Sequence, residues 1–151
     1  MPLPPQLLSP LDTRYRAPME ALGEHLSEAA LNRARVYVEV EWLIFLTDRS
    51  FFGSTPLSAE QQQSLRDIVT NFGQADIDEL ASIEATTRHD VKAVEYYVRA
   101  RLAERGLERI AELTHFACTS EDINNLSYAI TVRDAVEKVW LCLLYTSDAA
   151  D

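Results

Sequence analysis

Side chains capable of binding or catalysis are concentrated in residues 115–125, which read His-Phe-Ala-Cys-Thr-Ser-Glu-Asp-Ile-Asn-Asn. A helical pattern begins directly after Thr119, and Asp122 completes a Thr-x-x-acid capping arrangement. A helix start also presents free backbone N–H groups and the positive end of the helix dipole, which together suit an anion. A cap alone is the commoner reason for such a pattern. The alternative is a carboxylate or phosphate site at the adjacent hydroxyls of Thr119 and Ser120.

Two further polar groups lie in predicted loops. Arg14 and Tyr15 follow a proline-rich start, and the arginine offers a fork of donors suited to phosphate or carboxylate. Arg88, His89 and Asp90 lie between two predicted helices, where binding groups are often mounted. Asp90 can cap the following helix, and a histidine can exchange a proton near neutral pH. Taken singly, each group is more often solvated or capping than functional.

A metal centre is not expected, although His89, Asp90, His115 and Cys118 are all possible ligands. Neither Cys-x-x-Cys nor His-Glu-x-x-His spacing occurs in the sequence. A nucleophilic Cys118 would need an exposed thiolate beside a base, and a small buried thiol explains it better. The sequence therefore predicts neither a metal nor another cofactor.

Composition narrows the class of protein. The chain has 151 residues, 47% of them hydrophobic, which is enough for a core in one domain. A net charge of −10 without a basic stripe argues against binding to nucleic acid. No apolar run reaches the roughly 20 residues of a membrane span, and the start lacks the features of a signal peptide. With only two cysteines, read as reduced thiols, the chain is expected in the cytoplasm.

Apolar spacing predicts an all-α fold. Residues 1 to about 17 are expected to be irregular because of their prolines. Helices are predicted at about 27–49, 58–71, 75–87, 90–104, 107–113 and 120–140. Inward-facing stripes are predicted for the third of these, at Ile77, Leu80, Ala81 and Ile83, and for the last, at Ile123, Leu126, Ile130, Val136 and Trp140. Part of the last helix should expose apolar surface.

Three motifs together resemble a known family. They are residues 12–15 (Asp-Thr-Arg-Tyr), 86–96 (Thr-Thr-Arg-His-Asp-Val-Lys-Ala-Val-Glu-Tyr) and 115–125. In this order, over about residues 7–141, the chain resembles the N-terminal part of the adenylosuccinate lyases of the fumarase/aspartase superfamily. The resemblance implies a carbon–nitrogen lyase of purine biosynthesis. Such an enzyme eliminates fumarate from adenylosuccinate, giving AMP, and from succinylaminoimidazole carboxamide ribotide on the route to IMP.

The resemblance also implies roles for individual residues. Arg14 and Tyr15 match a pair that grips the nucleotide phosphate. Arg88, His89 and Asp90 match a triplet that contacts the substrate.

The stretch 115–125 receives its roles in the same way. Thr119 and Ser120 match hydroxyls that hold a carboxylate of the succinyl group. His115 matches a histidine in a supporting role. No cofactor is implied, and the partner is a small-molecule substrate.

Two departures from the family limit this interpretation. The family's general acid histidine and general base serine belong to motifs that lie beyond residue 151, so the chain alone is expected to be inactive. The resemblance divides the chain into an N-terminal helical domain (1–118), the start of a central helical bundle (119–141) and residues 142–151. That last segment does not match the family and is interpreted as foreign sequence, with a short natural tail as the alternative.

The resemblance also implies a homotetramer in which three protomers build each active site. The alternative from another class is a small helical interaction module that keeps lyase-like motifs without catalysis.

Overall fold

The computed structural model describes residues 9–142, and every regular element within that range is helical. The all-α prediction is therefore confirmed. The elements in chain order are η1 (Pro10–Asp12), α1 (Arg16–Leu26), α2 (Glu28–Asp48), η2 (Phe51–Gly53), α3 (Ala59–Thr70), α4 (Gln74–Thr87), α5 (Asp90–Glu104), η3 (Glu108–Leu113), α6 (Ser120–Ala135) and η4 (Val136–Trp140). η4 is a π-helical turn that continues α6. Apart from Cys142, the predicted foreign segment lies outside the described residues.

Helix α1 was missed by the sequence reasoning, which expected residues up to about 17 to be irregular. The helix begins at Arg16 and includes Pro18 in its first turn. Proline is tolerated there because a backbone N–H in the first turn has no partner within the helix. The bounds of α2 to α5 match their predicted ranges to within a residue or two at each end. The predicted helix 107–113 is the 3₁₀ helix η3, and the predicted helix 120–140 is α6 continued by η4. Ser58 opens α3 with a capping box to Gln61.

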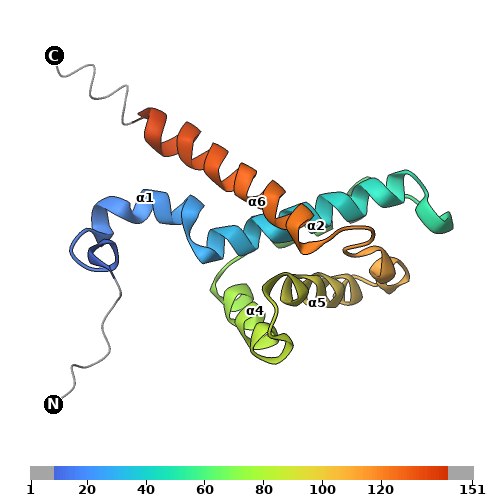
Figure 1. Cartoon of the computed structure of the whole chain (residues 1–151). Coiled ribbons are helices and arrows are strands. Elements are labelled where there is room, and N and C mark those ends of the chain that lie inside the picture. The colour runs from blue at the N-terminus through green and yellow to red at the C-terminus, as the bar shows by residue number, and fades with distance from the viewer. Residues whose placement is uncertain (1–8, 143–151) are drawn as a thin grey trace.

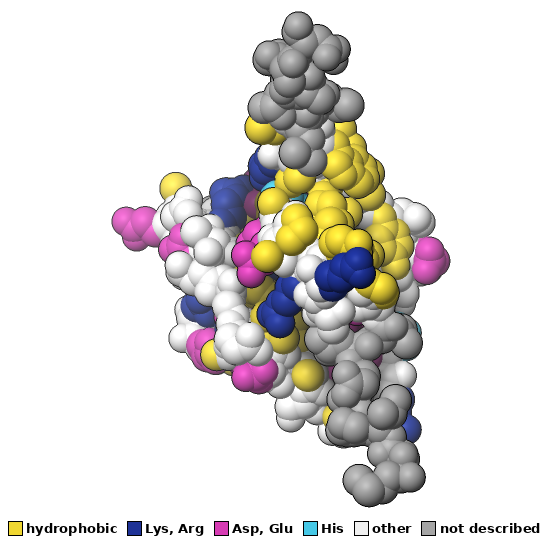
Figure 2. Space-filling view, turned by 90° about the vertical axis from the view of Figure 1, so that its left-hand side faces the viewer, with side chains coloured by type: hydrophobic (Ala, Val, Ile, Leu, Met, Phe, Trp, Pro, Cys, Tyr) yellow, Lys and Arg dark blue, Asp and Glu magenta, His cyan; other side chains and the backbone are white. Residues whose placement is uncertain are grey.

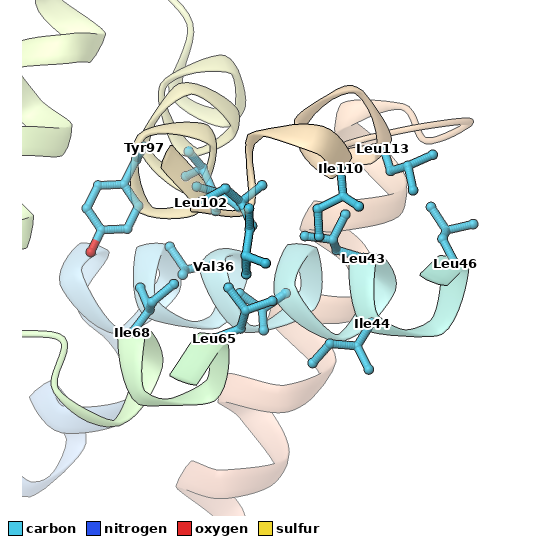
Figure 3. Packing of buried hydrophobic residues seen from close by; sticks show 14 of the residues in the cluster. Val36, Leu43, Ile44, Leu46, Leu65, Ile68, Tyr97, Leu102, Ile110 and Leu113 are labelled. Atoms are coloured by element: carbon cyan, nitrogen blue, oxygen red, sulfur yellow. The ribbon is translucent and has the colours of Figure 1, made fainter. Parts of the chain in front are cut away.

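Helix α2 is the central element of the fold. Figure 1 shows it running through the middle of the molecule, with α6 on one side and α5 on the other. It carries buried residues on several sides, because apolar residues occur all around it. In Figure 3, Leu43 of α2 faces Ile110 of η3, and Leu65 and Ile68 of α3 close the core from another direction. The groups that matter for function are arranged around this helix.

The buried face of α6 differs from the prediction. Its buried residues follow a spacing of four, at Ile123, Ser127, Thr131 and Ala135, whereas Leu126 is 55% exposed. Small side chains allow α6 to lie close to α2. The Ser127 hydroxyl can be buried because it donates a hydrogen bond to the backbone oxygen of Ile123 at 2.8 Å.

Two other residues of the predicted stripes are corrected by the structure. Trp140, in the π-helical turn after α6, is exposed, and so is Ala81 on α4, where only Leu80 is fully buried. A periodic pattern identifies a helical face, but the partner helix decides which of the neighbouring faces is covered.

The surface of α6 remains partly apolar, as expected from the sequence. Its exposed large side chains and those of the turn after it are Leu126, Tyr128, Val132, Trp140 and Leu141. Figure 2 shows hydrophobic side chains gathered in the upper part of one face of the molecule, with Lys and Arg beside them. Within residues 9–142, no helix is both long and apolar enough to cross a membrane.

Candidate functional site

The starts of α5 and α6 lie together around one buried arginine, Arg35 of α2. Its side chain is 4% exposed and donates from three nitrogens to three different residues. Nη2 donates to Asp90 Oδ2 at 2.6 Å, Nε to Asn124 Oδ1 at 2.9 Å, and Nη1 to Asn32 Oδ1 at 2.9 Å. The structure thus brings the predicted triplet 88–90 beside the predicted stretch 115–125.

Asp90 is held from two sides. Its Oδ1 accepts the backbone N–H of Val91 at 2.8 Å, and its Oδ2 accepts from Arg35. Partial burial opposes ionisation, but the Val91 N–H and the Arg35 charge outweigh it and lower the pKa of Asp90. The carboxylate is therefore ionised at neutral pH and already engaged by this chain.

The other members of the triplet are more open. Arg88 ends α4 in the left-handed conformation, with φ of 55°, and is exposed. His89 caps α5, because its Nδ1 accepts the backbone N–H of Lys92 at 3.2 Å. In the neutral ring this bond places the proton on Nε2. That nitrogen can donate to a ligand, and the side chain is 51% exposed.

The hydroxyls of Thr119 and Ser120 stand at the first residues of α6. Asp122 Oδ2 accepts the backbone N–H of Thr119 at 2.7 Å and its hydroxyl at 3.1 Å, so the predicted cap is present. These bonds from Thr119 lower the pKa of Asp122. A carboxylate held here would displace the Asp122 contact at the Thr119 hydroxyl or bind through Ser120 and the positive end of α6.

His115 is fixed to α2 by Glu39, which is fully buried. Glu39 Oε2 accepts the His115 backbone N–H at 3.0 Å, and Oε1 lies 2.5 Å from His115 Nδ1. Burial raises the pKa of Glu39 despite its contacts with His115. One turn further along α2, the Trp42 indole N–H donates to the Phe116 carbonyl at 2.9 Å.

The loop before α6 has a strained backbone. His115 has φ of 59° and Ala117 φ of 58°, both in the left-handed region that is unfavourable for residues with a Cβ. The bonds from Glu39 and Trp42 fall on the same loop and hold it in this conformation.

Cys118 has the properties of a structural thiol. Burial, followed by the charges of Glu39 and Asp122, raises its pKa to about 11. A thiolate is therefore scarce at neutral pH, in keeping with the prediction against a nucleophile. Within residues 9–142, no group of three or more His, Cys, Asp or Glu side chains is arranged to hold a metal ion.

Arg14 and Tyr15 are not brought to this place. They lie in the exposed loop before α1, at the end of that helix remote from α2 (Figure 1). Their contacts are local: the Arg14 guanidinium lies 5.2 Å from the Tyr15 ring centroid, and the Tyr15 N–H donates to the Pro10 carbonyl. One copy of the chain, as described, does not place all the predicted residues around one ligand.

Two grooves flank α6, and neither lining includes a predicted site residue. The larger, about 1000 Å³, lies among α2, α3 and the second half of α6, where Arg66 pairs with Glu41 and Lys138 with Asp134. The smaller, about 550 Å³, is mostly apolar and lies between α2 and the start of α6. The predicted residues other than Arg14 and Tyr15 lie instead at the starts of α5 and α6 and in the segments just before them.

Sequence reasoning assigned no role to Arg35 and Glu39, and it placed Trp42 only in the apolar stripe of its helix. All three α2 residues organise this surface. They are spaced by four and three residues, so they share one side of the helix. The available signal was an arginine and a glutamate one turn apart within an otherwise apolar run, in Arg-Val-Tyr-Val-Glu-Val. Such residues are buried only when paired.

Comparison with known proteins supports the resemblance. The chain is 44% identical over 136 residues to the adenylosuccinate lyase of Haemophilus influenzae, and 43% identical over 136 residues to that of Escherichia coli K12. Identity to the adenylosuccinate lyase of Dictyostelium discoideum is 38% over 138 residues. These matches cover 87–89% of the chain but only 29–30% of each relative. No protein-family model matches the chain.

The similarity covers most of the chain, and all three relatives carry the same name. The chain therefore belongs to the adenylosuccinate lyase family and spans about 30% of the length of the curated relatives that it matches.

Proposed function

We propose that this chain is a substrate-binding segment of an adenylosuccinate lyase. The complete enzyme would eliminate fumarate from adenylosuccinate, giving AMP, and from succinylaminoimidazole carboxamide ribotide in the synthesis of IMP. The observation that carries the proposal is the meeting of the 88–90 and 115–125 stretches at Arg35, in a chain 44% identical to a named lyase.

The chemistry gives the start of α6 its role. Removing a proton from the carbon beside a carboxylate places negative charge on that carboxylate in the transition state. The Thr119 and Ser120 hydroxyls and the positive end of α6 stabilise this charge more than they stabilise the ground state. His89, with Nε2 available, helps to place the substrate, and His115 supports the loop that carries the hydroxyls. The residues that move protons belong to the part of the enzyme outside this chain.

Arg14 and Tyr15 bind the nucleotide phosphate in this proposal and supply orientation rather than chemistry. Their distance from the α6 start supports a site shared between protomers, and we propose a homotetramer for the full-length enzyme. We further propose a cytoplasmic location, no cofactor, and a division at the α6 cap between an N-terminal helical domain (1–118) and the start of a central bundle (119–141).

The first test is whether activity depends on the missing part. The 151-residue chain should not cleave adenylosuccinate in an absorbance assay, whereas residues 1–141 joined to the remaining part of the E. coli relative should do so. A chimera that is folded and tetrameric by sedimentation, yet inactive on both purine substrates, would contradict the proposal.

The second test concerns the carboxylate site. In the active chimera, Ser120→Ala should lower kcat/KM by about 100-fold, the loss typical of one transition-state donor. Ser82→Ala is the matched control, because Ser82 is an exposed serine on α4 that lies outside the binding stretches. Equal activities of the two variants would rule out the role of Ser120.

A further inference from the structure

We propose that Arg35 and Glu39 are positioning residues, which act from inside α2 to set the geometry of the carboxylate-binding surface at the starts of α5 and α6. Arg35 fixes one helix start against the other through Asp90 and Asn124, and Glu39 fixes the loop that leads into α6 through His115. This inference deepens the proposed function and rests on it for the identity of the ligand.

Burying the charged side chains of Arg35 and Glu39 costs free energy. Arg35 is 4% exposed and Glu39 is fully buried, in a helix whose other buried residues are mostly apolar. Apolar residues of similar volume often stabilise such positions as well as a buried ion pair or better. Core stability alone therefore does not explain why charged residues occupy these positions. Their hydrogen bonds to the starts of α5 and α6 do explain it.

The hydrogen bonds of Arg35 and Glu39 end close to the proposed ligand contacts. Arg35 reaches Asp90, one residue from His89, and Asn124, four residues from Ser120. Glu39 holds His115, four residues before Thr119, with both of its oxygens. The hydrogen bonds from this side of α2 reach α5 and the segment that begins with His115. Each of them ends within a few residues of a proposed ligand contact.

Helix α2 holds these side chains rigidly. Arg35, Glu39 and Trp42 project from one face of a 21-residue helix packed into the core, so their partners are held relative to one another. Sites built on such elements are more exact than sites on loops, and a displacement of about 1 Å can cost about 100-fold in rate. Holding His115 and Ala117 in the left-handed region also requires external contacts, which Glu39 and Trp42 provide.

The contacts of Asp90 differ from the substrate contact that the resemblance implies for it. With Oδ1 on the Val91 N–H and Oδ2 on Arg35, its carboxylate is engaged on both oxygens. Asp90 then acts through Arg35 as a positioning residue, while Arg88 and His89 remain the members of the triplet open to substrate.

The test uses Arg35→Lys in the 151-residue chain, with Arg66→Lys as the matched control. Lysine keeps the charge but cannot supply donors in three directions. Arg66 makes a two-bond pair with Glu41 between α2 and α3 and contacts neither binding stretch. Backbone hydrogen exchange is measured for both variants, and fumarate is titrated against the Ser120 amide resonance.

We expect Arg35→Lys to accelerate exchange at the starts of both α5 and α6 and to weaken fumarate binding by about tenfold, with no such change in Arg66→Lys. Unchanged exchange at both starts, or equal losses of fumarate affinity in the two variants, would overturn the positioning role. If Arg35→Lys accelerates exchange at both helix starts but fumarate produces no shift in the wild-type chain, positioning is supported and the carboxylate site of the proposed function fails.

A second variant covers the case in which Arg35→Lys does not fold. Glu39→Gln keeps the side-chain shape while exchanging one acceptor for a donor. It should accelerate exchange and weaken fumarate binding at residues 115–120 while leaving the start of α5 unchanged. Uniform acceleration throughout the chain would instead indicate a merely structural role and contradict the proposal.

Discussion

The two groups of predicted binding residues differ in how the chain holds them. Around the starts of α5 and α6, the segments that carry the proposed ligand contacts are hydrogen-bonded to buried residues of α2 through Asp90, Asn124 and His115. The Arg14–Tyr15 loop is exposed, precedes α1, and is stabilised by contacts within a few residues of sequence. The first surface belongs to the core of this chain, whereas the second is a local structure on its periphery.

The difference shows which binding geometry this segment can supply by itself. Fixed donors contribute most when the charge they meet develops during reaction, and the α6 start is held in that way. The following changes test this distinction, from the largest expected effect to the smallest.

Removing the central arginine should have the largest effect on stability. Arg35→Met leaves Asp90, Asn32 and Asn124 without their shared donor, and we expect a loss of about 3 kcal/mol in the free energy of unfolding. Urea unfolding followed by circular dichroism measures it. A loss below about 1 kcal/mol would show that Arg35 is replaceable and would weaken the distinction between the two regions.

Asp90→Asn should cost about 1.5 kcal/mol at neutral pH, a value reduced because the carboxylate is 45% exposed. Because its pKa is lowered in the folded state, Asp90 contributes stability above its ordinary pKa of about 3.8 and loses it as the pH falls further. The difference between wild type and Asp90→Asn should therefore shrink from pH 5 to pH 2. A constant difference over this range would argue against an ionised partner of Arg35.

Glu39→Gln should show the opposite dependence on pH. Burial raises the pKa of Glu39, so its favourable contribution is complete below the ordinary value of about 4.5 and is lost as the pH rises through the folded pKa. We expect wild type to lose stability relative to Glu39→Gln as the pH rises above about 4.5. Denaturant titrations at each pH measure this, and a relative gain for wild type would mean that the His115 contact outweighs burial.

Ala117→Gly should raise the free energy of unfolding by about 1 kcal/mol. Ala117 is exposed and left-handed, and glycine adopts that conformation without the Cβ penalty. Ala81→Gly, within α4, is the control and should cost about 1 kcal/mol. Thermal unfolding separates the two, and a loss of stability in both variants would contradict a strained loop.

Substitutions in the outer loop should have the smallest effect. Arg14→Ala and Tyr15→Phe are each expected to change the free energy of unfolding by less than about 0.5 kcal/mol, because both residues are exposed and locally held. Chemical denaturation of the two variants provides the measurement. A loss above about 1 kcal/mol would mean that the loop is coupled to the core and that the two regions do not differ as described.

Much of the fold could be predicted from local pattern. The ranges of α2 to α5 followed from apolar periodicity and caps, because these signals lie within one helix. The buried face of α6 could not be predicted in the same way. Leu126 and Ser127 are adjacent, and only the close approach of α2 explains why the serine is buried and the leucine exposed. Helix α1 was missed because a cluster of prolines was taken to exclude a helix that in fact begins just before Pro18.

By itself the sequence determined the helical class, the capped start of α6 and the types of the candidate ligand residues, since each depends on near neighbours in the chain. Only the tertiary structure decided that Arg88–Asp90 and Thr119–Ser120 lie near one buried arginine while Arg14 and Tyr15 lie apart. It also decided that Asp90 faces Arg35. The packing of α2 against α5 and α6 creates these contacts, which join residues separated by 55 and by 89 positions in the sequence.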